Sequence, residues 1–228
     1  MRYMSIVAAL VIALSFLTSV RAERPVTEGA KVGEWTMDFD AAKALAKEKN
    51  LTILMNFTGS DWCGWCKLMD KNVFSKDDWK NYAKDKLILV FIDFPKDKSL
   101  VPGKRAEANK ALSEKFEVGG YPTYILLAPD GEKQLGKLGA SKDATPASFI
   151  QGIKKYTEWP TKIAKLTPAD KAIYDKATAG QEAVEKELKT WAATKPERND
   201  ENNKKFAGFM ERMKVCEKEI AELMEKQK

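Results

Sequence analysis

Histidine is absent from this chain of 228 residues. Its absence excludes a Ser-His or Cys-His nucleophile, a histidine general base and any metal or haem bound through imidazole. Cysteine is scarce as well, because Cys63, Cys66 and Cys216 are too few for a disulfide-stabilised scaffold and one short of a four-thiolate zinc site. Any chemistry must therefore use thiols, carboxylates or amines.

A large excess of charge of one sign is also missing. The chain has 39 basic and 33 acidic residues, which gives a formal net charge of +6, and the two signs are interspersed. Such a weak and mixed charge does not favour nucleic acid as a partner.

Long hydrophobic runs are confined to the N-terminus. An apolar run over residues 5–20 follows Arg2 and is followed by Arg21 and Ala22. This run is short of the ~20 residues of a membrane-spanning helix, and its layout is typical of a cleaved secretory signal. We expect residues 1–22 to be a signal peptide, the protein to be periplasmic or secreted, and no membrane span to remain after cleavage.

Strand-like and helix-like segments alternate from residue 32 to residue 156, which predicts an α/β domain whose sheet is covered by helices on both faces. Two continuous apolar runs, 51–57 and 87–93, are typical of buried central strands. The other expected elements are a helix capped by Asp38 or Asp40 and ending at Lys49, a helix starting at Ser75, a helix over 102–119, a hairpin over 123–138 and a helix over 146–155.

Residues 161–228 have a different composition, because strand-like runs disappear and Ala, Glu and Lys dominate. The pattern predicts an α-helical extension of two helices, which residues 195–200 separate. The second helix has an apolar seam that includes Cys216, and this seam favours an antiparallel hairpin over an intermolecular coiled coil. A homodimer through these helices stays an alternative, and Cys216 is expected to be buried in the seam unless it joins two chains.

Cys63 and Cys66 follow a predicted buried strand and open a predicted helix. Their spacing lets the two sulfurs bond to each other across one helical turn. The helix N-terminus favours a thiolate, so Cys63 is the expected nucleophile and Cys66 the resolving, less exposed thiol. No set of ligands for zinc accompanies the pair, and Lys67 stands where a haem-attachment motif needs histidine.

The segment Trp62-Cys63-Gly64-Trp65-Cys66-Lys67, the strand 53–57 before it and the segment 118–123 after it resemble the thioredoxin superfamily. They look most like secreted bacterial thioredoxin-like proteins with a W-C-x-W-C-K site, and the resemblance covers about residues 32–156. It implies a thioredoxin fold with a central mixed sheet, and a redox-active disulfide in place of any metal or other cofactor.

The resemblance also implies a substrate surface. Pro122 would be in the cis form beside the cysteines, and the backbone of Tyr121 would pair with an extended substrate peptide. Trp62 and Trp65 flank the thiols, and we interpret them as an apolar docking surface for polypeptide.

Two positions depart from thioredoxin itself. Asn56 stands where thioredoxin has a buried aspartate that accepts the proton of the resolving thiol, so Asp61, water or another carboxylate must serve instead. Gly64 and Trp65 stand where reducing thioredoxins have Gly-Pro, which leaves the direction of electron flow open.

These features together predict an exported thiol:disulfide oxidoreductase that exchanges disulfides with protein substrates and is served by a redox partner that the sequence does not identify. A first alternative is a non-catalytic binding module of the same fold, in which the cysteine pair is only a structural staple. A second is a dimeric disulfide isomerase assembled through the helical extension.

Overall fold

The computed structural model describes residues 25–101 and 103–227, so the expected signal peptide lies outside the described residues. The elements in chain order are β1 (Trp35–Thr36), α1 (Phe39–Lys49), β2 (Thr52–Thr58), α2 (Gly64–Met69), η1 (Asp70–Phe74), α3 (Asp77–Ala83), β3 (Leu87–Asp93), η2 (Lys98–Leu100), α4 (Gly103–Lys115), β4 (Thr123–Leu127), β5 (Gln134–Leu138), α5 (Pro146–Thr157), α6 (Trp159–Ile163), α7 (Pro168–Ala193) and α8 (Asp200–Lys226).

The sheet is mixed and has the strand order β1-β3-β2-β4-β5. Strands β1, β3 and β2 run parallel to one another, whereas β4 pairs antiparallel with both β2 and β5. The two apolar runs predicted as central strands are β2 and β3, and they lie side by side in the sheet. The prediction of an α/β thioredoxin fold with a central mixed sheet is confirmed.

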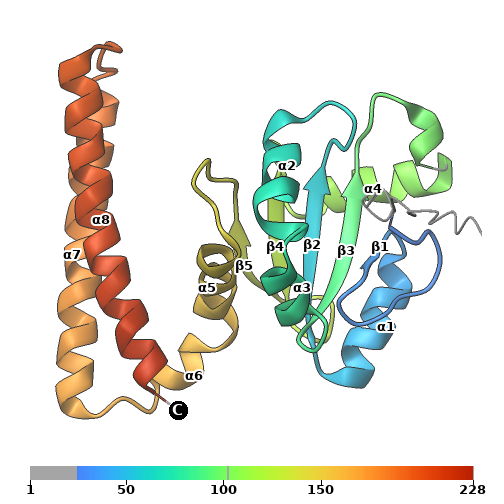
Figure 1. Ribbon diagram of the computed structural model, residues 1–228, viewed down its shortest axis with the longest axis horizontal. Coiled ribbons are helices and arrows are strands. Elements are labelled where there is room, and N and C mark those ends of the chain that lie inside the picture. The colour runs from blue at the N-terminus through green and yellow to red at the C-terminus, as the bar shows by residue number, and fades with distance from the viewer. Residues whose placement is uncertain (1–24, 102, 228) are drawn as a thin grey trace, which may run out of the picture.

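Helices cover both faces of this sheet (Figure 1). On one face, Ala42 and Ala46 of α1 pack with Phe116 against the sheet. On the other face, Met69 of α2 and Phe149 of α5 belong to a second buried cluster, which also includes residues of η1 and α3. The site described below lies on this second face, between α2 and the sheet.

Two expected helix boundaries are wrong. The helix expected to start at Ser75 is α3, which begins at Asp77. Ser75 instead ends the π-turn η1, and its hydroxyl donates a hydrogen bond to the carbonyl of Lys71. The helix expected over 102–119 ends at Lys115, because Glu117 takes a positive φ of 49° that an α-helix cannot contain.

The C-terminal extension is helical, as predicted. Helices α7 and α8 pack against each other as a hairpin, which Figure 1 shows standing beside the sheet domain as an arm. We call residues 168–226 the arm. Cys216 is half-buried, and a Cβ added to Gly180 of α7 would lie only 3.0 Å from its Sγ. The absence of a side chain at Gly180 therefore lets the two helices approach closely at Cys216.

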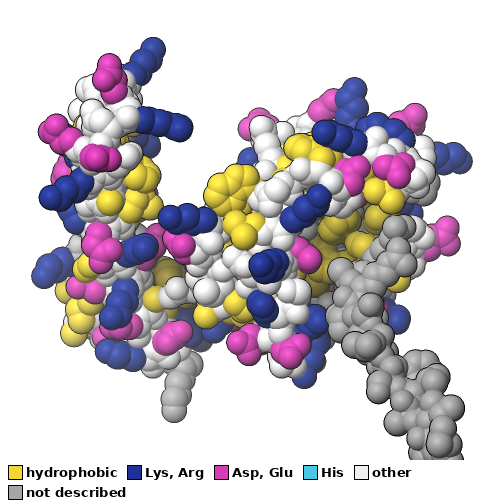
Figure 2. All heavy atoms as spheres, turned by 45° about the horizontal axis from the view of Figure 1, so that its top comes forward, with side chains coloured by type: hydrophobic (Ala, Val, Ile, Leu, Met, Phe, Trp, Pro, Cys, Tyr) yellow, Lys and Arg dark blue, Asp and Glu magenta, His cyan; other side chains and the backbone are white. Residues whose placement is uncertain are grey.

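The surface mixes charges of both signs. Figure 2 shows basic and acidic side chains interspersed over the face in view. Among the described helices, none is long and apolar enough to cross a membrane.

Candidate active site

The cysteine pair and Pro122 lie at the same edge of the sheet. Strand β2 ends at Thr58 and leads into the loop that carries Cys63. Strand β4 runs antiparallel to β2, with Thr123 opposite Phe57, so β4 begins where β2 ends. The Tyr121–Pro122 peptide bond just before β4 is cis, as the resemblance implied.

The cysteines form a disulfide at the start of α2. Their sulfurs are 2.08 Å apart and their Cα atoms 5.2 Å apart. Cys63 is the N-cap of α2, and its Sγ accepts a hydrogen bond from the backbone N–H of Cys66 at 3.1 Å. An N-cap position places a group among unpaired N–H donors and at the positive end of the helix dipole. When reduced, Cys63 therefore has surroundings that stabilise its thiolate.

The expected order of exposure is wrong. Cys63 is 4% exposed and Cys66 is 8% exposed, so the cysteine inside the helix is no less accessible than the first one. The reason is that Cys66 lines a cavity on the sheet side of α2. A sequence pattern places Cys66 one turn inside a helix but does not show that this face of the helix borders open space.

Aromatic side chains surround the disulfide on the outer side. Trp62 is 42% exposed and Trp65 is 51% exposed. The indole N–H of Trp62 donates a hydrogen bond to the carbonyl of Phe94 at 2.8 Å, and its ring meets Tyr121 edge-on with centroids 5.9 Å apart. Tyr121 in turn stacks on Phe94 at 5.2 Å. Trp62 is thus fixed in place while a large part of its surface stays open.

Gly59 is a residue of this site that the sequence reasoning missed. A Cβ at this position would lie 2.4 Å from the indole of Trp62, so only glycine allows the ring to rest against the loop. A glycine directly after a buried strand was the available signal, because such a residue often marks a close approach of backbone and side chain.

The loop between β2 and α2 is held by two carboxylates. Asp61 accepts hydrogen bonds from the backbone N–H groups of Lys96 and Asp97, and these bonds hold its pKa below the usual value. Asp93 at the end of β3 accepts bonds from the N–H and hydroxyl of Ser60, while burial raises its pKa. Asp61 is therefore poorly suited to be the proton acceptor that the sequence left open.

The two supporting residues Lys67 and Gly64 differ in their contacts. The ammonium of Lys67 donates a hydrogen bond to the backbone carbonyl of Asp61 at 2.6 Å, which ties α2 to the loop. A Cβ on Gly64 would meet nothing within 4 Å, so packing does not require glycine there.

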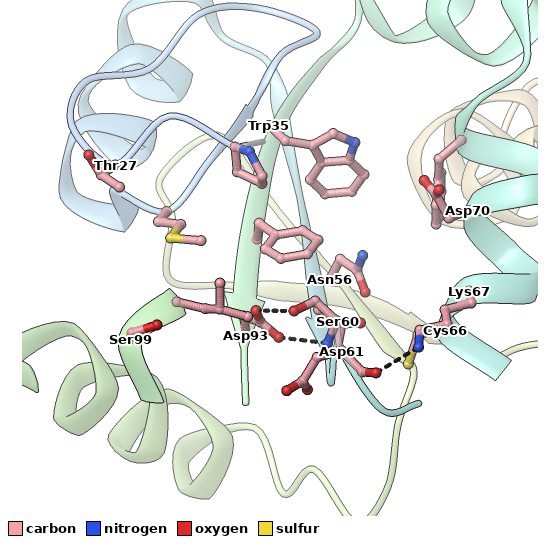
Figure 3. A pocket seen from close by; sticks show the side chains of 16 residues that line it. Thr27, Trp35, Asn56, Ser60, Asp61, Cys66, Lys67, Asp70, Asp93 and Ser99 are labelled. Atoms are coloured by element: carbon pink, nitrogen blue, oxygen red, sulfur yellow. Dashed lines mark hydrogen bonds between the residues drawn. The ribbon is translucent and has the colours of Figure 1, made fainter. Parts of the chain in front are cut away.

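The cavity behind the disulfide has a volume of about 590 Å³. Figure 3 shows Asn56, Asp70, Asp93 and Cys66 around it, and Trp35 at its apolar end. Asn56 is only 6% exposed, and its Oδ1 has no hydrogen-bond partner. Asp70 and Asp93 were not among the residues predicted for this site. A carboxylate four residues after Cys66 was the signal for Asp70, whereas Asp93 reaches the site only through the pairing of β3 with β2.

No group of cysteine, aspartate and glutamate side chains within residues 25–101 and 103–227 could hold a metal ion. The site is therefore built from a dithiol, aromatic side chains and buried polar groups.

This chain is similar to two known proteins of Chlamydia pneumoniae. The chain is 33% identical over 109 residues to the disulfide bond reductase DsbH of Chlamydia pneumoniae, a match that covers 48% of this chain and 64% of that protein. It is 28% identical over 168 residues to the thioredoxin-related protein DsbJ of the same organism, covering 74% of this chain and 47% of that protein. The chain thus spans less than two thirds of the length of these relatives.

A solved structure of a DsbH oxidoreductase superposes with a TM-score of 0.50 at 27% identity, covering 60% of this chain and 91% of that structure. The family model described as thioredoxin-like matches residues 34–129, which include β1 to β4 and the disulfide. With the observed strand order and the cysteine pair at the start of α2, this match shows a thioredoxin-like domain over residues 34–129.

Proposed function

We propose that this protein is an exported thiol:disulfide oxidoreductase that reduces disulfides in protein substrates. The observation that carries the proposal is the placement of Cys63 as the N-cap of α2, bonded to Cys66 and accepting the N–H of Cys66. This placement supplies what a nucleophilic thiol needs, because the helix N-terminus favours the thiolate at neutral pH.

The reaction proceeds in two exchanges. The Cys63 thiolate attacks one sulfur of a client disulfide, which forms a mixed disulfide and releases one client thiolate. The Cys66 thiolate then attacks Sγ of Cys63, so that the Cys63–Cys66 disulfide forms and the second client thiolate leaves. Two electrons pass from the protein dithiol to the client, and a redox partner must restore the dithiol.

The client docks on the outer side of the disulfide. Trp62 and Trp65 offer exposed aromatic surface beside the sulfurs, which suits the apolar side chains of unfolded or flexible polypeptide. An extended client segment pairs with the backbone of Tyr121, just before cis-Pro122. The reaction needs no cofactor other than the cysteine pair.

Reduction is the proposed direction because the relative that is 33% identical is named a disulfide bond reductase. Export is proposed because residues 1–22 have the layout of a secretory signal. The first residue of the mature chain would be Glu23, which N-terminal sequencing of the exported protein checks. A start at Met1 in the exported protein would contradict cleavage.

The central test is reduction of insulin by the pre-reduced protein. The Cys63→Ser variant should lose all turnover, whereas Cys216→Ser should keep the wild-type rate because Cys216 lies in the arm. The Cys66→Ala variant should stall as a mixed disulfide between Cys63 and the client. Turnover that survives Cys63→Ser, or a wild-type protein without turnover, would reject the proposal and favour a binding module with a structural disulfide.

A dimeric disulfide isomerase is the second candidate, and apolar side chains on α8 favour it. Phe206, Met210 and Val215 are all exposed in the single chain. A light-scattering mass of the mature protein, measured with and without reductant, decides between the two. A monomeric mass in both conditions leaves the reductase, and a dimeric mass supports the isomerase.

A further inference from the structure

The resolving thiol needs a proton acceptor, and the strand position that supplies one in thioredoxin holds Asn56 instead. An amide does not take up a proton near neutral pH, and Asp61 is held in its ionised form by the backbone of the residues just before η2. The proton of Cys66 must therefore go elsewhere. The following inference rests on the proposed thiol:disulfide exchange and concerns its second step.

The cavity behind α2 gives Cys66 access to polar groups that Cys63 does not reach. Cys66, Asn56 and Asp70 all line it, and Figure 3 shows the amide of Asn56 in the space between the strand and α2. Its volume of about 590 Å³ is far more than a water molecule needs. A chain of water in this cavity can connect groups that are too far apart for a direct hydrogen bond.

Two neighbouring buried oxygen atoms lack partners, and one of them belongs to the cavity lining. Asn56 of β2 and Tyr124 of β4 are paired residues in the sheet, so their side chains lie next to each other on one face. Asn56 Oδ1 and the Tyr124 hydroxyl are both buried without a hydrogen-bond partner. Unsatisfied buried oxygens are rare and costly, which indicates that Asn56 Oδ1, an atom of the cavity lining, bonds to water there.

Asp70 stands one helical turn after Cys66. Its backbone N–H donates a hydrogen bond to the carbonyl of Cys66, and the helix changes to the π-turn η1 at Asp70. Such π-turns are rare and occur often at functional sites. Burial raises the pKa of Asp70, and its charge in turn contributes to raising the pKa of Tyr124, after the larger effect of burial. The carboxyl is thus a better proton acceptor than an ordinary surface aspartate.

The charged groups around Asp70 are few. Lys80 of α3 acts to lower its pKa, but burial has the larger effect. Asp61, Lys67 and Asp93 line other parts of the same cavity. The ammonium of Lys67 is directed to the carbonyl of Asp61, and both oxygens of Asp93 accept bonds from Ser60. Asp70 therefore lies one helical turn from Cys66, and no side chain among the described residues donates a hydrogen bond to its carboxylate.

We propose that Asp70 accepts the proton of the Cys66 thiol through water in this cavity, which Asn56 holds in place. In the mixed disulfide, the Cys66 proton passes to the Asp70 carboxylate. The resulting thiolate attacks Sγ of Cys63, the bond from Cys63 to the client breaks, and the leaving client thiolate takes up a proton from solvent. Asp70 then releases its own proton to solvent, so that charge and electrons balance.

The test separates the two thiols kinetically in a Cys216→Ser background. The pre-reduced protein is mixed with an aromatic disulfide that releases a coloured thiolate. The first release reports attack by Cys63, and the second reports resolution by Cys66. In Asp70→Asn, the second release at neutral pH should be slower by about a hundredfold, at the low end of what a positioned base contributes. The pH profile of this second release should lose its acidic limb, which is the fall in rate at low pH. The first release should keep its rate.

Matched variants give the controls. Asp85→Asn removes an exposed carboxylate in the loop before β3 and should change neither release. Asp70→Glu keeps a carboxyl group and should restore the acidic limb of the second release. Asp93→Asn should leave that limb in place. If Asp93→Asn removes the limb and Asp70→Asn does not, the proposal is overturned in favour of Asp93.

A further measurement uses the protein with no substitution at this site, so its result does not depend on whether the variants fold. The carboxyl titration of Asp70, followed by NMR, should move to higher pH when the Cys63–Cys66 disulfide is reduced, because Asp70 and Cys66 then compete for one proton. Equal titrations in both redox states, or an Asp70→Asn protein with the normal second release, would overturn the role of Asp70. Loss of the first release in wild-type protein would instead reject the proposed function.

Discussion

The sheet domain and the arm are stabilised in different ways. The domain has two buried clusters, one on each face of the sheet, and their central side chains are fully buried. The arm has one small cluster, formed by Ala177, Ile220, Leu223 and Met224, at the end nearest α6. Toward its other end, Phe206 and Met210 are exposed although they are apolar residues of α8.

This difference shows in which kind of element an apolar sequence pattern is enough to bury the side chains. A strand in the middle of a sheet is covered on both faces, so nearly every apolar residue of β2 and β3 finds neighbours. A hairpin of two helices covers only the facing stripe of each helix. The arm therefore has a smaller buried core than the domain, and we expect it to lose structure before the domain does.

The largest loss of stability is expected from Trp79→Ala in the sheet domain. Trp79 is buried against Phe74 and Phe149, so its removal should lower the free energy of unfolding by about 3–5 kcal/mol. Urea unfolding followed by circular dichroism measures the loss. The control is Trp65→Ala, which removes an exposed indole and should change stability by less than about 0.5 kcal/mol. Equal losses would contradict the assignment of Trp79 to the core.

A smaller and local loss is expected from Met224→Ala in the arm. Met224 is fully buried in the arm cluster, and its truncation should cost about 2 kcal/mol, the low end for such a change. Hydrogen exchange should become faster in α7 and α8 and stay unchanged in β2 and β3. The exposed Met210, changed to Ala, serves as the control. Faster exchange throughout the sheet would mean that the arm and the domain unfold together.

The pH dependence of the domain gives a third test. The Asp38 carboxylate accepts hydrogen bonds from Ala41 and Gly29, and these bonds hold its pKa below the ordinary value of 3.8. Because the folded pKa is lowered, the stabilisation is complete above that ordinary value and is lost as the pH falls through the folded pKa.

Two substitutions separate the cap from the charge. Asp38→Ala should cost about 1 kcal/mol at neutral pH, as the loss of an N-cap does. Asp38→Asn keeps a capping side chain and should cost less, with a difference from wild type that disappears in acid. Thermal unfolding across the acidic range measures both. A difference between the Asp38→Asn variant and wild type that stays constant with pH would show that the carboxylate charge contributes nothing.

The smallest effect concerns the ion pair between the two helices of the arm. Arg212 of α8 donates hydrogen bonds to both carboxylate oxygens of Glu187 of α7 at 2.7 and 2.9 Å. The pair is exposed, so Arg212→Gln should lower the melting temperature of the arm only slightly, and high salt should remove the difference. Lys218→Gln, which breaks a pair within α8, is the control and should have no effect on the packing of α7 against α8.

Much of the domain could be predicted from the sequence because its signals are local. The continuous apolar runs of β2 and β3, the turn between β4 and β5 and the cap at Asp38 each depend on a few neighbouring residues. The cysteine pair is equally local, since its spacing and its place after a strand define it. These elements were predicted correctly although two helix ends were not.

The cavity could not be predicted, because it joins segments that are distant in the sequence. Trp35 from β1, Phe91 from β3 and Leu100 from η2 line the same cavity as Cys66 only after the sheet has formed. The greater exposure of Cys66 and the surroundings of Asp70 follow from this long-range assembly. A sequence pattern shows which face of a helix is apolar, but it does not show where packing leaves a space.

The connection between the arm and the domain has a mechanical consequence. The ammonium of Lys162 in α6 donates a hydrogen bond to the carbonyl of Met224 near the end of α8. Helices α7 and α8 have 26 and 27 residues, so at 1.5 Å per residue the arm is about 40 Å long. Helix α6 joins this long arm to the sheet domain. A rotation of about 10° at α6 would move the far end of the arm, the turn between α7 and α8, by roughly 7 Å.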